Sequence, residues 1–215
     1  MDNPTRLLLE KTVFELECSG LSHAGAGAGA DVTIPTSMAF SSGMQAVTSI
    51  LLAHSTSGQE GTTVLIPTDV YHGVRSLLSD VFVRHGVKVR ELNMVDTPNN
   101  NNSDNTNEAK GARAIVDTIL EIASASAAFE GGDRPCNESI QNSEHAKDRG
   151  SVIVWMETPS NPKCEVVDIE AICEAVRSEE SRWKDILEVT TVVDGTMASP
   201  LLTRPLEVRR NQHFG

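Results

Sequence analysis

The stretch 151-SVIVWME-157 decides the fold. Its apolar run from Val152 to Met156 is unbroken and ends at an acid, Glu157. A β strand that is apolar along its whole length, rather than at every second residue, is typical of a parallel sheet with helices on both faces. Two further stretches, 62-TTVLIP-67 and 190-TTVVD-194, have the same character. We therefore expect one parallel sheet in an α/β protein.

Helical and extended patterns alternate on both sides of this stretch. A first helix is expected to begin at Asn3–Pro4, where an N-cap acceptor precedes a proline, with Leu9, Val13 and Leu16 on one face. The strands are expected at 37–40, 62–67, 87–92, 151–157 and 190–194, and the later helices at 43–54, 73–85, about 112–127 and 169–176. In the helix at 73–85 the expected apolar face consists of Val74, Leu77, Leu78, Val81 and Phe82. This alternation favours a layered α/β fold.

Three low-complexity stretches interrupt the alternation. Residues 98–110 and 129–150 are polar, and we predict that they are surface loops or disordered insertions rather than domain boundaries. The stretch 24-AGAGAGA-30 is glycine-rich like a phosphate-binding loop, but no Gly-Lys-Ser/Thr follows it. We interpret it as a spacer.

Composition narrows the class of partner. The 215 residues carry 18 Lys and Arg against 30 Asp and Glu, a net charge of −12. Nucleic acids and anionic membranes bind concentrated positive charge, so neither is expected as the main partner. The four cysteines and six histidines are dispersed, without CxxC or HExxH spacing, so no metal site is predicted. Reduced thiols and the absence of a recognisable presequence favour the cytoplasm, or an organelle if a transit peptide precedes the chain.

Polar residues gather where the predicted strands end. They are Ser41 to Met44 after the first strand, Asp69 and Tyr71 after the second, Glu157 to Pro162 after the fourth, and Asp194 to Thr196 after the last. Ligands of open α/β sheets bind outside the carboxyl ends of the strands. We therefore expect these four groups to face one crevice.

Each group predicts a contact, and each has a simpler alternative. Gly43 and Met44 open a helix whose N-terminal N–H groups suit a phosphate, although they also fit an ordinary helix cap. Tyr71, the one tyrosine of the chain, offers a flat face for stacking on a ring, or a side chain for the core. Asn161, held between two prolines, can direct its amide at a ligand oxygen.

Two acids end predicted buried strands. Glu157 and Asp194 are costly to bury unless they are paired. A cationic ring nitrogen is one suitable partner, which Asp194 would keep protonated. The alternative is an ordinary salt bridge to Arg75 or Arg204.

A phosphate, a flat ring, a ring oxygen and a protonated ring nitrogen together describe pyridoxal 5′-phosphate. The chain resembles the Cys/Met-metabolism family of pyridoxal-phosphate enzymes, the cystathionine γ-synthase and γ-lyase group. The resemblance rests on NPTRLLLEKTVFELE, AFSSGMQAV, DVYHGVRSLL, VWMETPSNPKCEVVDIEAI and VVDGTMASPLLTRPLE, which cover most of the chain. The pair ETPSNP and VVDGT is the most specific part.

The resemblance implies a fold and a function. The fold is the three-layer, parallel-sheet cofactor domain of the aspartate-aminotransferase-like class, fold type I, with 1–215 as a truncated part of it. The function is transsulfuration in methionine biosynthesis, by γ-replacement or γ-elimination on activated homoserine, cysteine or cystathionine, in a homo-oligomer. Gly195 and the sequence YHG are similar to γ-synthases rather than γ-lyases.

The resemblance also implies roles for matching positions. Gly43 and Met44 would donate to the cofactor phosphate, Tyr71 would stack on the ring, and Asn161 would lie beside the ring hydroxyl. Asp194 would partner the ring nitrogen so that the ring acts as an electron sink. Thr196 would line the ring, and Glu157 is included among the cofactor-binding residues.

Some parts of the family pattern are absent from the sequence. The lysine that forms a Schiff base with the cofactor follows PLE in the family, whereas VRRNQHFG follows it here, so we predict no catalytic lysine. Lys163 does not stand in the right context. The family's Tyr-x-Arg before NPT and its C-terminal small domain are also missing. We therefore expect either an incomplete gene model or a truncated, non-catalytic member that acts in binding or subunit interaction, inactive alone.

Overall fold

The computed structural model describes residues 3–18, 37–55, 61–95, 110–129 and 149–208. Four parallel strands form one sheet in the order β2-β1-β3-β4. The strands are β1 Thr62–Pro67, β2 Lys88–Leu92, β3 Gly150–Glu157 and β4 Leu187–Asp194. The register places Glu157 beside Asp194 and Trp155 beside Val192. The parallel α/β sheet expected from the sequence is confirmed.

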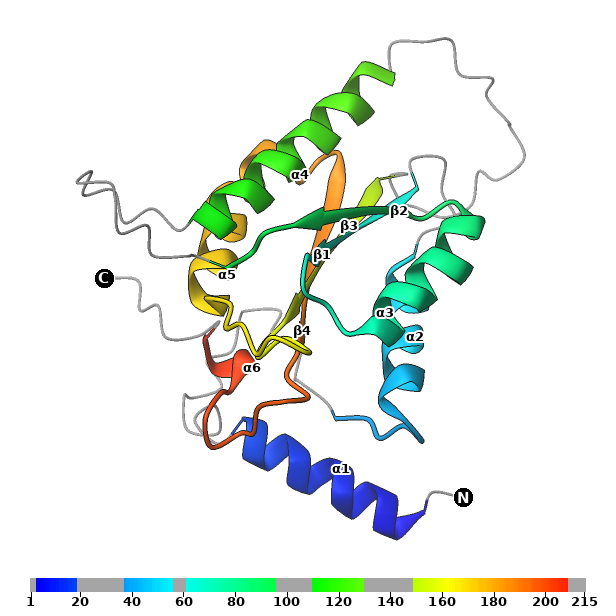
Figure 1. Ribbon diagram of the computed structural model, residues 1–215, viewed down its shortest axis with the longest axis vertical. Helices are drawn as coiled ribbons and strands as arrows, with labels where there is room; N and C mark the ends of the chain where they lie inside the picture. Colours follow the sequence, from blue (N-terminus) through cyan, green and yellow to red (C-terminus); the bar gives the residue numbers. More distant parts are fainter. Residues whose placement is uncertain (1–2, 19–36, 56–60, 96–109, 130–148, 209–215) are drawn as a thin grey trace, which may run out of the picture.

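Helices cover both faces of this sheet, which gives three layers (Figure 1). On one face lie α2 Gly43–His54 and α3 His72–Leu77, and on the other α4 Lys110–Phe129 and α5 Ile169–Ser178. Each face has its own apolar cluster. β3 contributes to both: Val152, Val154 and Met156 pack towards α4 and α5, while Ile153 and Trp155 pack towards α2 and α3. The unbroken apolar run of β3 follows from this double burial.

The helix expected at 73–85 is helical throughout but not uniform. After α3 it continues as a π-helical turn, Leu78–Phe82, and a 3₁₀ turn, Val83–His85. Val74, Leu78 and Phe82 are buried, but Val81 is 44% exposed, so its predicted place on the apolar face is wrong. The wider π turn keeps Leu78 and Phe82 in line and leaves Val81 on the solvent side.

The strand predicted at 37–40 is wrong as well. These residues have no regular secondary structure and belong to no sheet, and the backbone N–H of Ala39 donates to the Glu10 side chain (2.9 Å) of the first helix instead of to a strand. That helix, α1 Pro4–Glu17, starts as predicted, with Asn3 Oδ1 accepting from the N–H of Thr5 and Arg6. None of its residues is buried, and the apolar side chains expected on one face, Leu9, Val13 and Leu16, are half exposed.

Burial on both faces holds only for the two central strands. β1 and β3 are buried along their whole length, whereas the edge strands β2 and β4 carry exposed residues. The expectation of burial along the whole strand was therefore wrong for 190–194, because β4 is an edge strand with a neighbour on one side only within the described sheet. Two short helical segments, Glu180–Arg182 and α6 Pro205–Val208, complete the described elements.

The polar insertions fall almost entirely outside the described residues. Of the ranges 98–110 and 129–150, the structure describes only their ends: Lys110 and Phe129 belong to α4, and Gly150 begins β3. The spacer at 24–30 also lies outside the described residues. In the described parts of the chain, no helix is both long and apolar enough to cross a membrane.

Candidate functional site

A cavity of about 490 Å³ lies at the carboxyl ends of β3 and β4, below the start of α2. This volume is typical of a small-molecule site. All seven predicted site residues line it: Gly43, Met44, Tyr71, Glu157, Asn161, Asp194 and Thr196. They come from four segments of the chain that are far apart in the sequence. The expectation that the polar groups share one crevice is therefore met, although the first group follows a segment without regular secondary structure and not a strand.

The N-terminus of α2 forms one wall of the cavity. The Ser42 side chain caps the helix by accepting from the N–H of Gln45 (3.2 Å). The N–H groups of Gly43 and Met44 donate to no residue that the structure describes, and both residues line the cavity. A side chain added at Gly43 would meet nothing within 4 Å, so the space beside its backbone is open. Such a helix start suits an anion.

Tyr71, from the loop after β1, also lines the cavity. Its side chain is 43% exposed, so the alternative that it packs in the core is wrong. Its backbone N–H donates to Glu157 Oε2 (2.7 Å), which fixes the loop that carries the ring. Gly73, which the sequence reasoning missed, allows the ring its position, because a Cβ there would lie 2.5 Å from Tyr71 Cε1 and 3.0 Å from Met44 Sδ.

Glu157 is buried at the end of β3, with 3% of its surface exposed. Its Oε1 accepts from the N–H of Asn161 (2.8 Å) and its Oε2 from the N–H of Tyr71. Burial raises the pKa of this carboxyl above its ordinary value of 4.5, and the two hydrogen bonds oppose that rise. The nearby carboxylate of Asp194 adds to the increase.

Asp194 lines the cavity, and its two carboxylate oxygens differ in their hydrogen bonds. Its Oδ1 accepts from both the N–H (3.0 Å) and the hydroxyl (2.6 Å) of Thr196. Its Oδ2 accepts from no residue in the described ranges, so it remains able to bind a ligand. The alternative of a salt bridge to Arg75 or Arg204 is wrong, since these guanidinium groups pair with Glu91 and Glu207.

A further residue of the site was not singled out from the sequence. Trp155 is 2% exposed and lines the cavity floor, and its Nε1–H finds no acceptor among the described residues. The nitrogen itself is shielded from the cavity surface, so it is one of the uncommon buried donors without a partner. The available signal was its period-two position: Trp155 stands two residues before Glu157, on the same face of β3.

No lysine of the described chain lines this cavity. Lys163, the one closest in sequence to a motif, points its Nζ to Glu165 (4.0 Å) and is largely exposed. Nor do the described residues gather three His, Cys, Asp or Glu side chains in a group that could hold a metal ion.

Comparison with known proteins places this cavity in context. A model of the family described as "Cys/Met metabolism PLP-dependent enzyme" matches residues 1–112 and 133–209. The chain belongs to this family. Its members depend on pyridoxal 5′-phosphate, and the matched residues include all seven that were predicted for the site.

Similar proteins carry related names. The chain is 27% identical over 205 residues to cystathionine β-lyase MetC of Bacillus subtilis, and 28% identical over 206 residues to cystathionine γ-synthase of Mycobacterium tuberculosis. These alignments cover 95% and 96% of the chain but 35% of each relative. The chain therefore spans about a third of the length of the curated relatives that it matches.

Solved structures agree on the fold. The cystathione γ-lyase CalE6 of Micromonospora echinospora superposes with a TM-score of 0.57 at 26% identity, over 96% of this chain and 36% of that one. A cystathionine γ-synthase of Xanthomonas oryzae, solved in complex with cystathionine, gives a TM-score of 0.57 at 23% identity, over 96% and 36% of the two chains. The three-layer arrangement is thus that of part of the pyridoxal-phosphate enzymes of this group.

Proposed function

We propose that this chain forms the pyridoxal-phosphate-binding part of a transsulfuration enzyme, similar to cystathionine γ-synthase or γ-lyase. One observation carries the proposal: seven residues chosen from four separate stretches of sequence line a single cavity. The substrate is an amino acid of the activated homoserine, cysteine or cystathionine type, and the protein is a homo-oligomer of the cytoplasm. The substrate class and the oligomer rest on the family resemblance, and the location rests on the dispersed cysteines and the lack of a recognisable presequence.

The cavity residues fit the cofactor at its two charged ends. The N–H groups of Gly43 and Met44 bind the phosphate, since they have no partner in the described chain and stand at a helix N-terminus. Asp194 Oδ2 would accept a hydrogen bond from the protonated ring nitrogen at the other end. Thr196 orients the Asp194 carboxylate with two hydrogen bonds to Oδ1, which leaves the other oxygen for the ring.

The faces and edge of the ring are held by uncharged groups. Tyr71, exposed on the cavity wall, stacks on the ring, and the Asn161 amide lies beside the ring hydroxyl. Val192, from the edge strand β4, lines the cavity beside Trp155 and offers apolar contact. Glu157 does not contact the cofactor in this scheme, because both of its oxygens are already used by backbone N–H groups.

The cofactor, when bound, supplies the electron sink for a substrate carbanion. The contribution of this chain is to hold the ring in place and to keep its nitrogen protonated through the Asp194 carboxylate. Proton transfer at the substrate requires a base, and no lysine lines the cavity in the described residues. We therefore expect this chain to bind the cofactor without turnover.

The experiment is a binding measurement with two ligands. Pyridoxamine 5′-phosphate needs no lysine and reports the cavity alone, whereas pyridoxal 5′-phosphate reduced with borohydride marks any lysine that it has reached. We expect the purified chain to bind the amine form with saturation and to show no stoichiometric labelled lysine. Absence of saturable binding would contradict the proposed site, and stoichiometric labelling of one lysine would contradict the proposed lack of a catalytic lysine.

A further inference from the structure

We propose that Asp69 and Glu157 are a crossed pair of positioning residues that fix the positions of Tyr71 and Asn161 in the wall of the cavity. Asp69 stands on the first of the two loops that border the cavity, and Glu157 is the last residue of β3, directly before the second loop; each acid reaches to the other loop. The loops are 68–71, after β1, and 158–165, after β3. The ligand named in the test rests on the proposed function, but the positioning itself does not.

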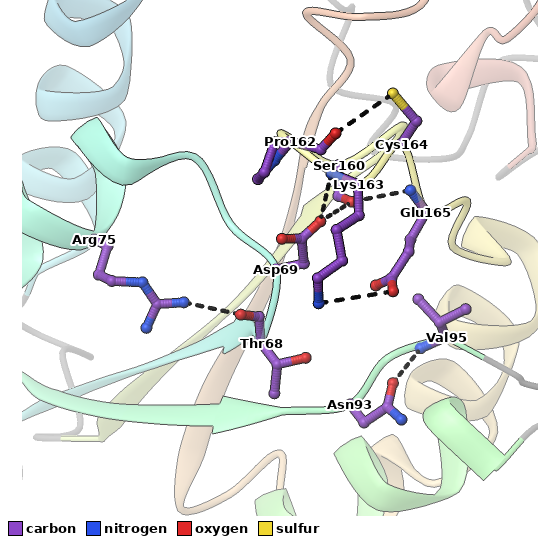
Figure 2. Close-up of polar contacts among 10 residues, drawn as sticks. All are labelled: Thr68, Asp69, Arg75, Asn93, Val95, Ser160, Pro162, Lys163, Cys164 and Glu165. Carbon is purple, nitrogen blue, oxygen red and sulfur yellow. Dashed lines mark hydrogen bonds and ion pairs between the residues drawn. The ribbon is translucent and has the colours of Figure 1, made fainter.

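Asp69 reaches from the first loop to the second. Its Oδ2 accepts from the hydroxyl of Ser160 (2.5 Å) and from the backbone N–H of Lys163 (3.1 Å). Figure 2 shows this carboxylate pointing into the turn formed by residues 160–165. The Ser160 hydroxyl in turn accepts from the N–H of Glu165 (3.0 Å), so this carboxylate oxygen adds to the backbone bonds that close the turn, Ser160 N–H to Glu165 O (2.9 Å) and Cys164 N–H to Ser160 O (2.9 Å). Asp69 is buried, with 7% of its surface exposed.

Glu157 reaches in the opposite direction. It stands at the base of the second loop, and its Oε2 accepts from the N–H of Tyr71 in the first. Its Oε1 accepts from the N–H of Asn161, which lies four residues further along the chain, in the second loop. The backbone N–H groups of Tyr71 and Asn161 therefore each bind one of the two oxygens of a single carboxylate. Since Tyr71 and Asn161 both line the cavity, the Glu157 carboxylate sets their separation.

The carboxylates are the whole polar connection between these loops in the described structure. Three hydrogen bonds join the loops, and each ends on Asp69 or Glu157. Main-chain pairing does not replace them, because the direct β1–β3 pairs end at Leu65 and Val154, before either loop begins. Without the two carboxylates, the loops would contact each other only by packing, although each keeps hydrogen bonds to a neighbouring strand end.

The two acids use their oxygens differently, and this gives a sharp test. Asp69 accepts both of its bonds at Oδ2, so an asparagine can keep them with its single carbonyl oxygen. Glu157 uses one oxygen for each bond, so a glutamine must turn its NH₂ group towards one of the two N–H donors. Both substitutions remove one negative charge. A role in positioning predicts opposite outcomes, and a role through charge predicts similar ones.

The chain provides its own probe, since Tyr71 is the single tyrosine. Replacement of tyrosine by 3-fluorotyrosine gives one ¹⁹F resonance that reports the surroundings of this ring. We would record it for the intact chain, Asp69→Asn, Asp69→Ala and Glu157→Gln, with circular dichroism as the check of folding. Titration with pyridoxamine 5′-phosphate supplies the second readout.

We expect Asp69→Asn to keep the wild-type resonance and to bind within about twofold of the wild-type affinity. Glu157→Gln and Asp69→Ala should shift or split the resonance and weaken binding about tenfold, the effect of one lost hydrogen bond to a charged group. The proposal is overturned if Glu157→Gln leaves the resonance unmoved, or if Asp69→Asn behaves like Asp69→Ala or fails to fold.

Two outcomes separate this inference from the proposed function. If the intact chain does not bind pyridoxamine 5′-phosphate, the proposed function fails, while the ¹⁹F comparison still decides whether the acids position Tyr71. If Glu157→Gln does not fold, the Asp69 pair decides alone: a shift in Asp69→Ala that Asp69→Asn restores supports the inference, and equal spectra overturn it.

Discussion

Substitution of Gly73 by alanine should weaken cofactor binding while leaving the fold intact. The added Cβ would lie 2.5 Å from Tyr71 Cε1, whereas carbon atoms in contact are ordinarily about 3.5 Å apart, so the ring edge must retreat by about 1 Å. The ring can do so, because 43% of Tyr71 is exposed. Met44 Sδ would be 3.0 Å from the new carbon, so the Cβ has no room to move away from the ring on that side.

The expected change in stability is small. Alanine gains up to about 1 kcal/mol over glycine in a helix, and a ring held off its preferred rotamer loses about 0.5–1.5 kcal/mol. These effects offset each other, so the free energy of unfolding should stay within about 1 kcal/mol of wild type and Tm within about 2–4 °C. Loss of an aligned ring contact, worth about 0.5–1.5 kcal/mol, should reduce affinity for pyridoxamine 5′-phosphate about three- to tenfold.

Gly111→Ala is the matched control with the opposite outcome. Its Cβ would lie 2.4 Å from the backbone oxygen of Met94, a buried residue that cannot swing aside. Overpacking of this kind costs about 1–3 kcal/mol, so Tm should fall. Thermal unfolding and calorimetric titration on both variants check the pair. If Gly73→Ala binds the ligand as tightly as wild type, or if it unfolds like Gly111→Ala, the account of how Tyr71 is placed is refuted.

Three further expectations concern the ends of the cavity and its buried acid. Asp194→Ala should lower affinity for pyridoxamine 5′-phosphate at least about tenfold with little change in Tm, because the lost group is the ring-nitrogen partner. Glu188, an exposed residue of the same strand, provides the control: Glu188→Ala should bind the ligand normally. Gly43→Ala should fold normally, since its Cβ meets nothing within 4 Å, but it should bind phosphate less well because the methyl group enters the cavity; equal phosphate affinity would contradict the assignment of this wall. The raised pKa of Glu157 means that this carboxyl keeps its proton in the folded state at a pH where the unfolded state has lost it. The stability of wild type relative to Glu157→Gln should therefore decline as pH rises from 4.5, the ordinary pKa of the group, through the raised pKa. Urea denaturation over that pH range would show no such decline if the carboxyl were not buried.

The sequence was sufficient for the parts of the fold that local pattern determines. The apolar runs at 62–67 and 151–157 gave the central strands, and the proline and cap at Asn3–Pro4 gave the start of α1. One failed prediction, the strand at 37–40, had the right local pattern. A strand also needs a neighbouring edge, and that information lies in distant residues, here Glu10, which binds Ala39.

The site shows the same division. Its lining residues could be predicted, because strand ends meet at one edge of a parallel sheet. The hydrogen bonds that hold those residues could not, since the bond from Tyr71 to Glu157 joins positions 86 residues apart. The importance of Gly73 could not be predicted from the sequence for a related reason. Its importance lies in the space that it leaves for Tyr71, and an empty space has no signature in the sequence.

The double-sided burial of β3 has a consequence for the evolution of this protein. Val152, Val154 and Met156 face only the cluster beneath α4 and α5, so selection acts on them through packing alone. Trp155 belongs to the opposite cluster and also lines the cavity, so selection acts on it through both packing and ligand binding. Tolerance to substitution should therefore alternate along a single strand. A drift towards a different ligand would change the strand at every second residue while its other residues stayed the same.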